Sequence, residues 1–142
     1  MSAEENKAIA RRAYEIFSSG NLEALQEVIA PDLVDHNAAP GQAPGIEGTR
    51  QVLGMLRAAF PDLRLTPEDL IAEGDRVVAR LMVTGTHQGE FQGLPPTGKQ
   101  VTMSGIEIVR LAGGKAVERW GEFDILGLLQ QLGAVPAPGA AG

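Results

Sequence analysis

The sequence contains no cysteine and only two histidines, and Phe, Trp and Tyr together make up 4% of its 142 residues. Without cysteine the chain can form neither a disulfide nor a thiolate metal site, and it has no cysteine nucleophile. A zinc site usually needs three or four ligands. Neither His-x-x-x-His nor Glu-x-x-His spacing occurs at His36 or His87, so we expect no bound metal.

Positive charge is scarce as well, because 12 Lys and Arg stand against 18 Asp and Glu, for a net charge of −6. Binding to nucleic acid needs a basic surface, and so does docking on anionic lipid. No apolar run reaches the length of a membrane span, and the first residues lack the apolar segment of a signal peptide. We therefore expect a cytoplasmic protein that binds neither nucleic acid nor a membrane.

The length and composition indicate one globular domain. A chain of 142 residues with 44% hydrophobic residues can bury roughly two-thirds of its unfolded surface. We place this domain at residues 1–134. The segment 135–142 consists of Val, Pro, Ala and Gly and is expected to be a disordered tail, because it cannot bury a core.

Helical periodicity characterises the first half of the chain. Ser2 and Glu5 have the spacing of a capping box, and apolar residues recur on one face over 2–19. A second apolar stripe predicts a helix over 21–30 that the following proline stops, and a third helix is expected over 49–60. Three helices are thus expected before the first hairpin.

Two hairpins are predicted in the second half. Extended runs over 63–87 turn at Glu73-Gly74-Asp75, and runs over 99–123 turn at Gly113-Gly114. A short helix is expected over 125–132. Helices followed by hairpin-linked strands are typical of an α+β fold with an antiparallel sheet and helices on one face. Such a sheet, if curved, would leave a pocket on its concave side.

The string GLPPTGK, residues 93–99, contains most of a phosphate-binding loop. However, Gln100 stands where the magnesium-binding Ser or Thr belongs, and a predicted strand follows where a helix is required. Ser104 lacks the Gly-x-Ser-x-Gly setting of a nucleophilic serine. We therefore interpret 93–99 as a turn and expect no serine-based chemistry.

Carboxylates in the predicted strands are the strongest candidates for chemistry. Glu107 alternates in phase with the apolar Val101 and Met103, so it either faces inward or marks a break in register. Arg80 also lies between apolar neighbours in its strand. One interpretation is a cross-strand ion pair between Arg80 and Glu107. The other is an acid and a base lining an apolar cavity, where burial makes a carboxylate a better base.

Asp124 is the most specific of the carboxylates. It follows the last predicted strand, in which Glu118, Trp120 and Glu122 share one face. Asp124 is either the N-cap of the helix after it or a base. An aspartate packed between Trp120 and Phe123 would suit the abstraction of a proton next to a carbonyl. The residues alone leave both interpretations open.

Several strings of the sequence resemble one family. LVDHN, AFPDL, EGDRVVARLMVTGTHQGEFQGLPPTG, GIEIVR and GGKAVERWGEFDILGLLQQLG resemble, in this order, the SnoaL-like polyketide cyclases, also called ester cyclases. The resemblance extends from about Glu4 to Gly133. It implies the cone-shaped α+β barrel that the family shares with ketosteroid isomerase, the NTF2-like fold. In that fold a curved antiparallel or mixed sheet is wrapped by the N-terminal helices.

The resemblance also implies an activity. The founding cyclases close the last ring of anthracycline precursors by an intramolecular aldol condensation, without a metal or any other cofactor. An aspartate near the end of the last strand removes a proton from a carbon flanked by carbonyls, and the enolate attacks a carbonyl of the same molecule. The implied substrate is therefore a hydrophobic, polyketide-like small molecule.

The family's site residues imply roles for residues of this chain. Asp124 is the expected base, with Glu122 as its nearest rival, and His36 is the expected second catalytic residue. Asn37 completes the DHN string and is expected to bind substrate oxygens, while Trp120 would form a flat wall. The remaining expected substrate contacts are Arg80, Glu107, Tyr14 and Phe60.

The strand before the last one departs from the family pattern. The resemblance implies a second histidine near the aspartate, whereas Glu107 and Arg110 stand on the corresponding strand here. A glutamate there would change the charge of the pocket and could change its chemistry. Alternatives to a cyclase are a hydrolase that activates water between Asp124 and Arg80, a hydroxylase of the same fold, and a non-catalytic module that binds a hydrophobic metabolite. A second copy often covers exposed sheet in small barrels, so we also expect a homodimer.

Overall fold

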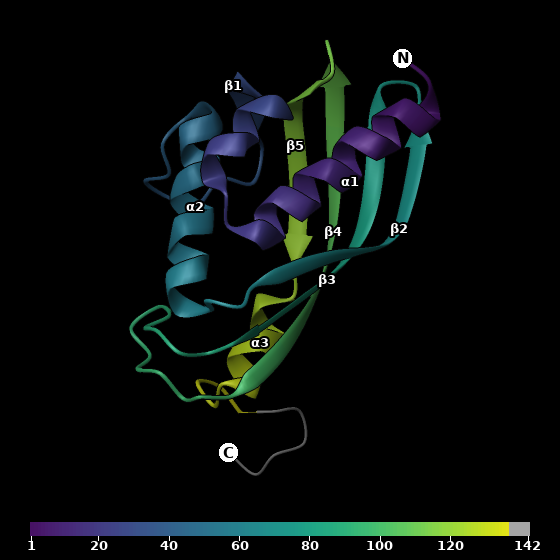
Figure 1. Cartoon of the computed structure of the whole chain (residues 1–142). Coiled ribbons are helices and arrows are strands. Elements are labelled where there is room, and N and C mark those ends of the chain that lie inside the picture. The colour runs from purple at the N-terminus through teal and green to yellow at the C-terminus, as the bar shows by residue number, and fades with distance from the viewer. Residues whose placement is uncertain (137–142) are drawn as a thin grey trace.

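A five-stranded sheet forms the centre of the computed structural model, which describes residues 1–136 (Figure 1). The strands are β1 Ile29–Asp35, β2 Arg64–Glu73, β3 Arg76–Thr86, β4 Gln100–Ala112 and β5 Lys115–Phe123. Their order is β1-β5-β4-β3-β2, with β1 parallel to β5 and all other pairs antiparallel. The sheet is therefore mixed and open, with β1 and β2 at its edges. The tail predicted at 135–142 lies, from residue 137 on, outside the described residues.

Helices from the first half of the chain cover one face of the sheet, which we call the inner face. Helix α1 (Ala3–Ser19) crosses this face, and α2 (Gly45–Ala59) packs beside β1 (Figure 1). A short 3-10 helix, η1 (Leu22–Glu27), connects α1 to β1, and α3 (Ile125–Gln131) follows β5. The predicted α+β architecture, a curved sheet covered by the N-terminal helices, is confirmed.

Two predicted helix boundaries are wrong. The second predicted helix is only the six-residue η1, and β1 begins at Ile29 and includes Pro31. Pro31 fits there because β1 is an edge strand, where a missing N–H need not break a ladder. Helix α2 begins at Gly45 rather than Thr49. Gly45 has a φ of +70°, and a Cβ there would clash with the Pro31 carbonyl oxygen, so this entry to the helix requires glycine.

Both predicted hairpins are confirmed, with β2 and β3 meeting at Gly74 and β4 and β5 at Gly113-Gly114. Alternation along the strands directs apolar side chains to the inner face. Val77, Ala79 and Leu81 of β3 are almost fully buried in a cluster that includes side chains of α1. A second cluster, which includes Phe60 and Leu128, is buried between the end of α2, the strand ends and α3.

The register of three neighbouring strands brings three charged side chains together on the inner face. Asp35 at the end of β1 pairs with Arg119 of β5, and Gly121 of β5 pairs with Glu107 of β4. Side chains alternate between the two faces of a sheet, so Asp35, Arg119 and Glu107 point to the same side. The inward phase predicted for Glu107 is confirmed, because its residue is only 8% exposed.

Candidate functional site

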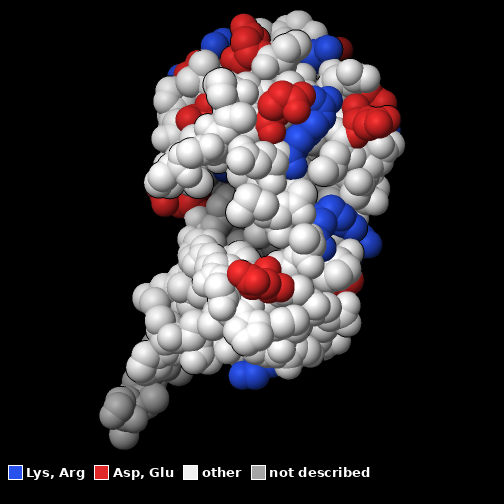
Figure 2. All heavy atoms as spheres, turned by 90° about the vertical axis from the view of Figure 1, so that its left-hand side faces the viewer, with Lys and Arg blue, Asp and Glu red and all other residues white. Residues whose placement is uncertain are grey.

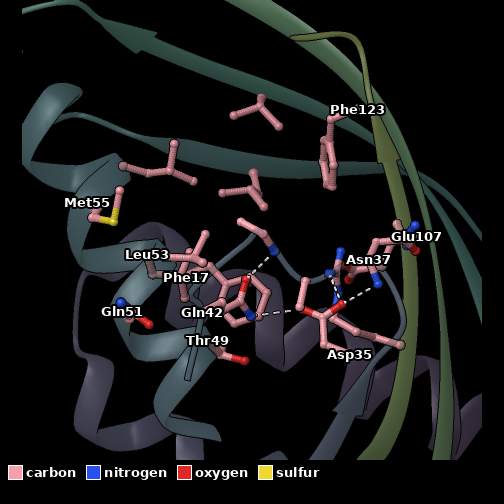
Figure 3. Close-up of a pocket in the computed structure, with 18 of the residues that line it drawn as sticks. Phe17, Asp35, Asn37, Gln42, Thr49, Gln51, Leu53, Met55, Glu107 and Phe123 are labelled. Atoms are coloured by element: carbon pink, nitrogen blue, oxygen red, sulfur yellow. Dashed lines mark hydrogen bonds and ion pairs between the residues drawn. The ribbon is translucent and has the colours of Figure 1, made fainter. Parts of the chain in front are cut away.

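The inner face of the sheet, α1, α2 and two loops enclose a cavity of about 1300 Å³. The molecule is hollowed on the side where α2 lies, and uncharged residues surround most of that hollow (Figure 2). Pockets for drug-sized ligands typically measure about 300–1,000 Å³, so a polycyclic molecule has room here. The wall is mainly apolar and includes Leu33, Leu65 and Val83. Phe17, Leu53 and Phe123 also line it (Figure 3).

Four polar side chains meet in the wall of this cavity, and we call them the ionic cluster: Tyr14, Asp35, Glu107 and Arg119. The Tyr14 hydroxyl donates to Glu107 Oε1 at 2.7 Å. Arg119 Nε and Nη2 donate to Glu107 Oε2 at 3.0 and 2.8 Å. Arg119 Nη1 donates to Asp35 Oδ1 at 2.8 Å. One guanidinium is thus shared between two carboxylates.

Burial in this cluster shifts two ionisation equilibria. Burial and then the adjacent Glu107 carboxylate raise the pKa of Tyr14 well above its ordinary value, so the hydroxyl keeps its proton. Burial alone would lower the pKa of Arg119, but the charges of Glu107 and Asp35 outweigh that effect and raise it. The cluster therefore contains a neutral phenol, a permanent cation and two carboxylates.

The cavity is acidic. Among the described residues that line it, the carboxylates are those of Asp35, Glu90, Glu107 and Glu122, whereas Arg119 is the one Lys or Arg. Every nitrogen of the Arg119 guanidinium already donates to Glu107 or Asp35. Two carboxylates against one guanidinium leave the ionic cluster with a formal charge of −1. A bound anion would therefore find no free cation in this wall.

Asn37, predicted to bind substrate oxygens, lies at the same cavity. Its Oδ1 accepts a hydrogen bond from the backbone N–H of Gly121 at 2.8 Å. Only the oxygen of an amide can accept, so this contact fixes the orientation of the Asn37 amide. Its NH₂ group makes no hydrogen bond within residues 1–136 and is free to donate to a ligand.

Arg80 and Trp120, two of the expected substrate contacts, lie on the outer face of the sheet. The predicted ion pair between Arg80 and Glu107 is wrong, because the register sets Ala79 opposite Glu107 and turns Arg80 to the other side. Arg80 pairs instead with Asp69 at 2.7 Å. Trp120 also alternates away from the cavity and is not among the residues that line it.

His36 and Phe60 are likewise engaged elsewhere. The imidazole of His36 stacks on Trp120 with ring centroids 4.6 Å apart and bonds to Glu118 at 2.8 Å. The bonds from His36 and Arg110 lower the pKa of Glu118. His36 borders the cavity, but its ring faces outward because Asp35 before it faces inward. Phe60 is buried in the second core cluster and does not line the cavity.

Asp124 is the N-cap of α3. Its carboxylate accepts from the Gly127 N–H at 2.9 Å, is exposed to solvent and does not line the cavity. The expected apolar surroundings of Asp124 are therefore absent, because its side chain caps the first turn of α3 at the surface. Glu122, its predicted rival, borders the cavity but is also exposed.

Sequence reasoning missed Asp35 and Arg119 as members of the site. A signal for Arg119 was present, since it alternates in phase with Gly121 and Phe123, as Glu107 does with its apolar neighbours. Its partnership with Asp35 depends on the parallel pairing of β1 with β5. No short-range pattern in the sequence predicts that pairing.

The described residues lack two features. No helix there is long and apolar enough to cross a membrane. In the same part of the chain, no group of three or more His, Asp or Glu side chains is arranged to hold a metal ion.

Several known proteins are similar to this chain in sequence. The nogalonic acid methyl ester cyclase of Streptomyces nogalater is 30% identical over 119 residues, which is 82% of this chain and 89% of that protein. The aklanonic acid methyl ester cyclase DnrD of Streptomyces peucetius is 28% identical, over 88% of each chain.

Solved structures of other proteins are also similar to this chain, in both fold and sequence. TsrD of Streptomyces laurentii matches with a TM-score of 0.87 and 30% identity, over 95% of this chain and 99% of the other. IdmH of Streptomyces antibioticus matches with a TM-score of 0.82 and 38% identity, over 90% and 98%. The family model described as SnoaL-like polyketide cyclase matches residues 7–132. The chain belongs to the SnoaL-like polyketide cyclase family.

Proposed function

We propose that this protein is a cofactor-independent cyclase that closes a ring in a polyketide-like carbonyl compound by an intramolecular aldol-type reaction, with Glu107 as the base. The observation that carries the proposal is a buried carboxylate, held by Tyr14 and Arg119, in the wall of a large apolar cavity. Relatives at about 30% identity are named as cyclases of acid methyl esters. An ester of this kind suits a wall that offers no free cation.

The two oxygens of Glu107 have different surroundings. Oε2 accepts both bonds from Arg119, whereas Oε1 accepts only the bond from Tyr14. Oε1 therefore retains a lone pair for a proton from a carbon flanked by two carbonyls. The two bonds from Arg119 hold the Glu107 carboxylate in one orientation while Oε1 accepts the proton.

The ring closure balances with these groups. The proton passes from the substrate carbon to Glu107, and the resulting enolate carbon attacks a second carbonyl of the same molecule to form the new C–C bond. The alkoxide then takes the proton back from Glu107. The Asn37 NH₂ is a free donor at this wall, and a donor placed where negative charge develops stabilises such an intermediate. The high pKa of Tyr14 suits a group that donates its one O–H to Glu107 without losing the proton.

The choice between Glu107 and Asp124 is open to a direct test with matched amides. In an assay of ring closure with aklanonic acid methyl ester, Glu107→Gln should lower the rate by about 10²–10⁴-fold, the usual contribution of a general base. Asp124→Asn should leave the rate within about threefold, since Asn caps a helix about as well as Asp.

The reverse pattern would make Asp124 the base, as the family resemblance implies. Binding of the ester by the wild-type chain without any turnover would favour a non-catalytic binding module. Circular dichroism of both variants checks that the fold is retained.

Tyr14 is the one tyrosine of the chain, so absorbance of tyrosinate reports on it alone. Because burial and Glu107 raise its pKa, the wild-type signal should appear only well above pH ~10, the ordinary midpoint. In Glu107→Gln the negative neighbour is gone, and the signal should appear at a lower pH than in the wild type. A wild-type midpoint at the ordinary value would mean that Tyr14 is solvated and not a held donor.

We further infer that the protein acts as a homodimer in the cytoplasm, with the outer face of the sheet as its interface. On this face the register aligns Ile71, Val78, Ile108 and Trp120 in one row across four strands. Ile71 is 63% exposed in the single chain. An apolar row of this length is typical of a surface that another sheet covers. The two-fold arrangement would place the same row on both partners.

Sedimentation velocity tests the dimer. The wild-type chain should sediment at about twice its mass of 15.0 kDa, and Ile108→Glu should shift it to the single mass by burying a charge in the interface. Met55→Glu, at an exposed apolar residue of α2, is the control and should leave the dimer intact. A wild-type protein that remains a single chain at all concentrations would contradict the inference.

A further inference from the structure

Asp35 is a largely buried carboxylate of the cavity to which the proposed reaction gives no role. Its side chain is 12% exposed. Oδ1 accepts from Arg119 Nη1 at 2.8 Å and from the Asn37 N–H at 2.9 Å, and Oδ2 accepts from Gln42 Nε2 at 3.1 Å (Figure 3). Asp35 thus joins the guanidinium that holds Glu107 to the loop that walls the cavity.

The charge of Arg119 is divided between two carboxylates. Nη1 bonds to Asp35, while Nε and Nη2 bond to Glu107. A cation next to a carboxylate favours its ionised form, and a second anion nearby opposes that effect. With Asp35 ionised, Arg119 is partly neutralised, so Glu107 remains able to take up a proton. With Arg119 acting on Glu107 alone, the carboxylate would be a weaker base.

We propose that Asp35 is a positioning residue that sets the proton affinity of Glu107 through their shared guanidinium. This role rests on the proposed function, in which Glu107 is the base. Asp35 touches no reacting atom in it. Its effect reaches the substrate through the basicity of Glu107.

Other charges around Glu107 are few. Tyr14 faces it from α1 and Arg119 from β5, and its neighbour on β3 is the uncharged Ala79. The other carboxylates of the wall, Glu90 and Glu122, are exposed, and solvent weakens their influence. Asp35 is therefore the one carboxylate, among the described lining residues, that shares a buried partner with Glu107.

The effect of the Asp35 charge on Glu107 must be separated from the effect of the contact between Asp35 and the loop. Gln42 bonds to Asp35 through Nε2 and accepts from the Ala39 N–H through Oε1 at 3.0 Å. Residues 38–42 line the cavity. Gln42→Ala removes this anchor without changing any charge, whereas Asp35→Asn removes the charge and also disturbs the anchor. Comparison of the two variants isolates the electrostatic effect.

The test is a ¹³C NMR titration of the Glu107 side-chain carboxyl, assigned with Glu107→Gln, because this readout does not depend on turnover. In Asp35→Asn the carboxyl should take up its proton at a pH lower by about 0.5 unit or more. In Gln42→Ala the midpoint should not move. Asp35→Glu, which keeps the charge, should retain the wild-type midpoint and serves if Asp35→Asn fails to fold.

Two results would overturn the proposal. The midpoint of Glu107 could be the same in Asp35→Asn as in the wild type, or it could shift equally in Gln42→Ala, which would assign the effect to the loop. Absence of ring closure by the wild-type chain would count against the proposed function alone, since the titration is read without substrate. Where closure is found, the acid limb of its pH–rate profile should move with the NMR midpoint.

Discussion

The shared guanidinium of Arg119 is the interaction on which this site depends. Glu107 is buried and Asp35 is largely buried beside an apolar cavity, and an unpaired buried charge is strongly unfavourable. Arg119 gives each of them a charge-assisted hydrogen bond. Removing Arg119 from this cluster would cost about 3–5 kcal/mol, because it would leave both carboxylates without a cation. Arg119 thus holds both carboxylates in place in the cavity wall.

The fold assembles this cluster from segments that are distant in the chain. Helix α1 supplies Tyr14, β1 supplies Asp35, and the hairpin of β4 and β5 supplies Glu107 and Arg119. The parallel pairing of β1 with β5 sets Asp35 opposite Arg119. Solved structures of similar proteins share the fold, and relatives at about 30% identity are named as ester cyclases. In this chain a glutamate with an arginine partner stands on the strand where the family resemblance implies a histidine.

Local patterns in the sequence predicted much of this fold and part of the site. Glycine turns marked both hairpins, and alternation placed Glu107 on the inner face, because each depends on residues close in sequence. The same alternation turns Arg80 and Trp120 outward, but the direction of each face could be assigned only once the register was known. The sequence around Asp124 fitted two interpretations, an N-cap and a base. The start of α3 at Ile125 shows that Asp124 is the N-cap. Arg119 meets Asp35 because β1 and β5, which are far apart in the sequence, pair in the sheet. Short-range sequence patterns do not predict such a pairing.

The most direct test of the account is exchange of the acidic C–H of aklanonic acid methyl ester with D₂O, observed by NMR. Proton abstraction is the step assigned to Glu107, and exchange detects it whether or not the ring closes. The wild-type protein should accelerate exchange over buffer, Glu107→Gln should not, and Asp124→Asn should behave as the wild type. Equal acceleration by the wild type and Glu107→Gln would contradict the assignment of Glu107 as the base.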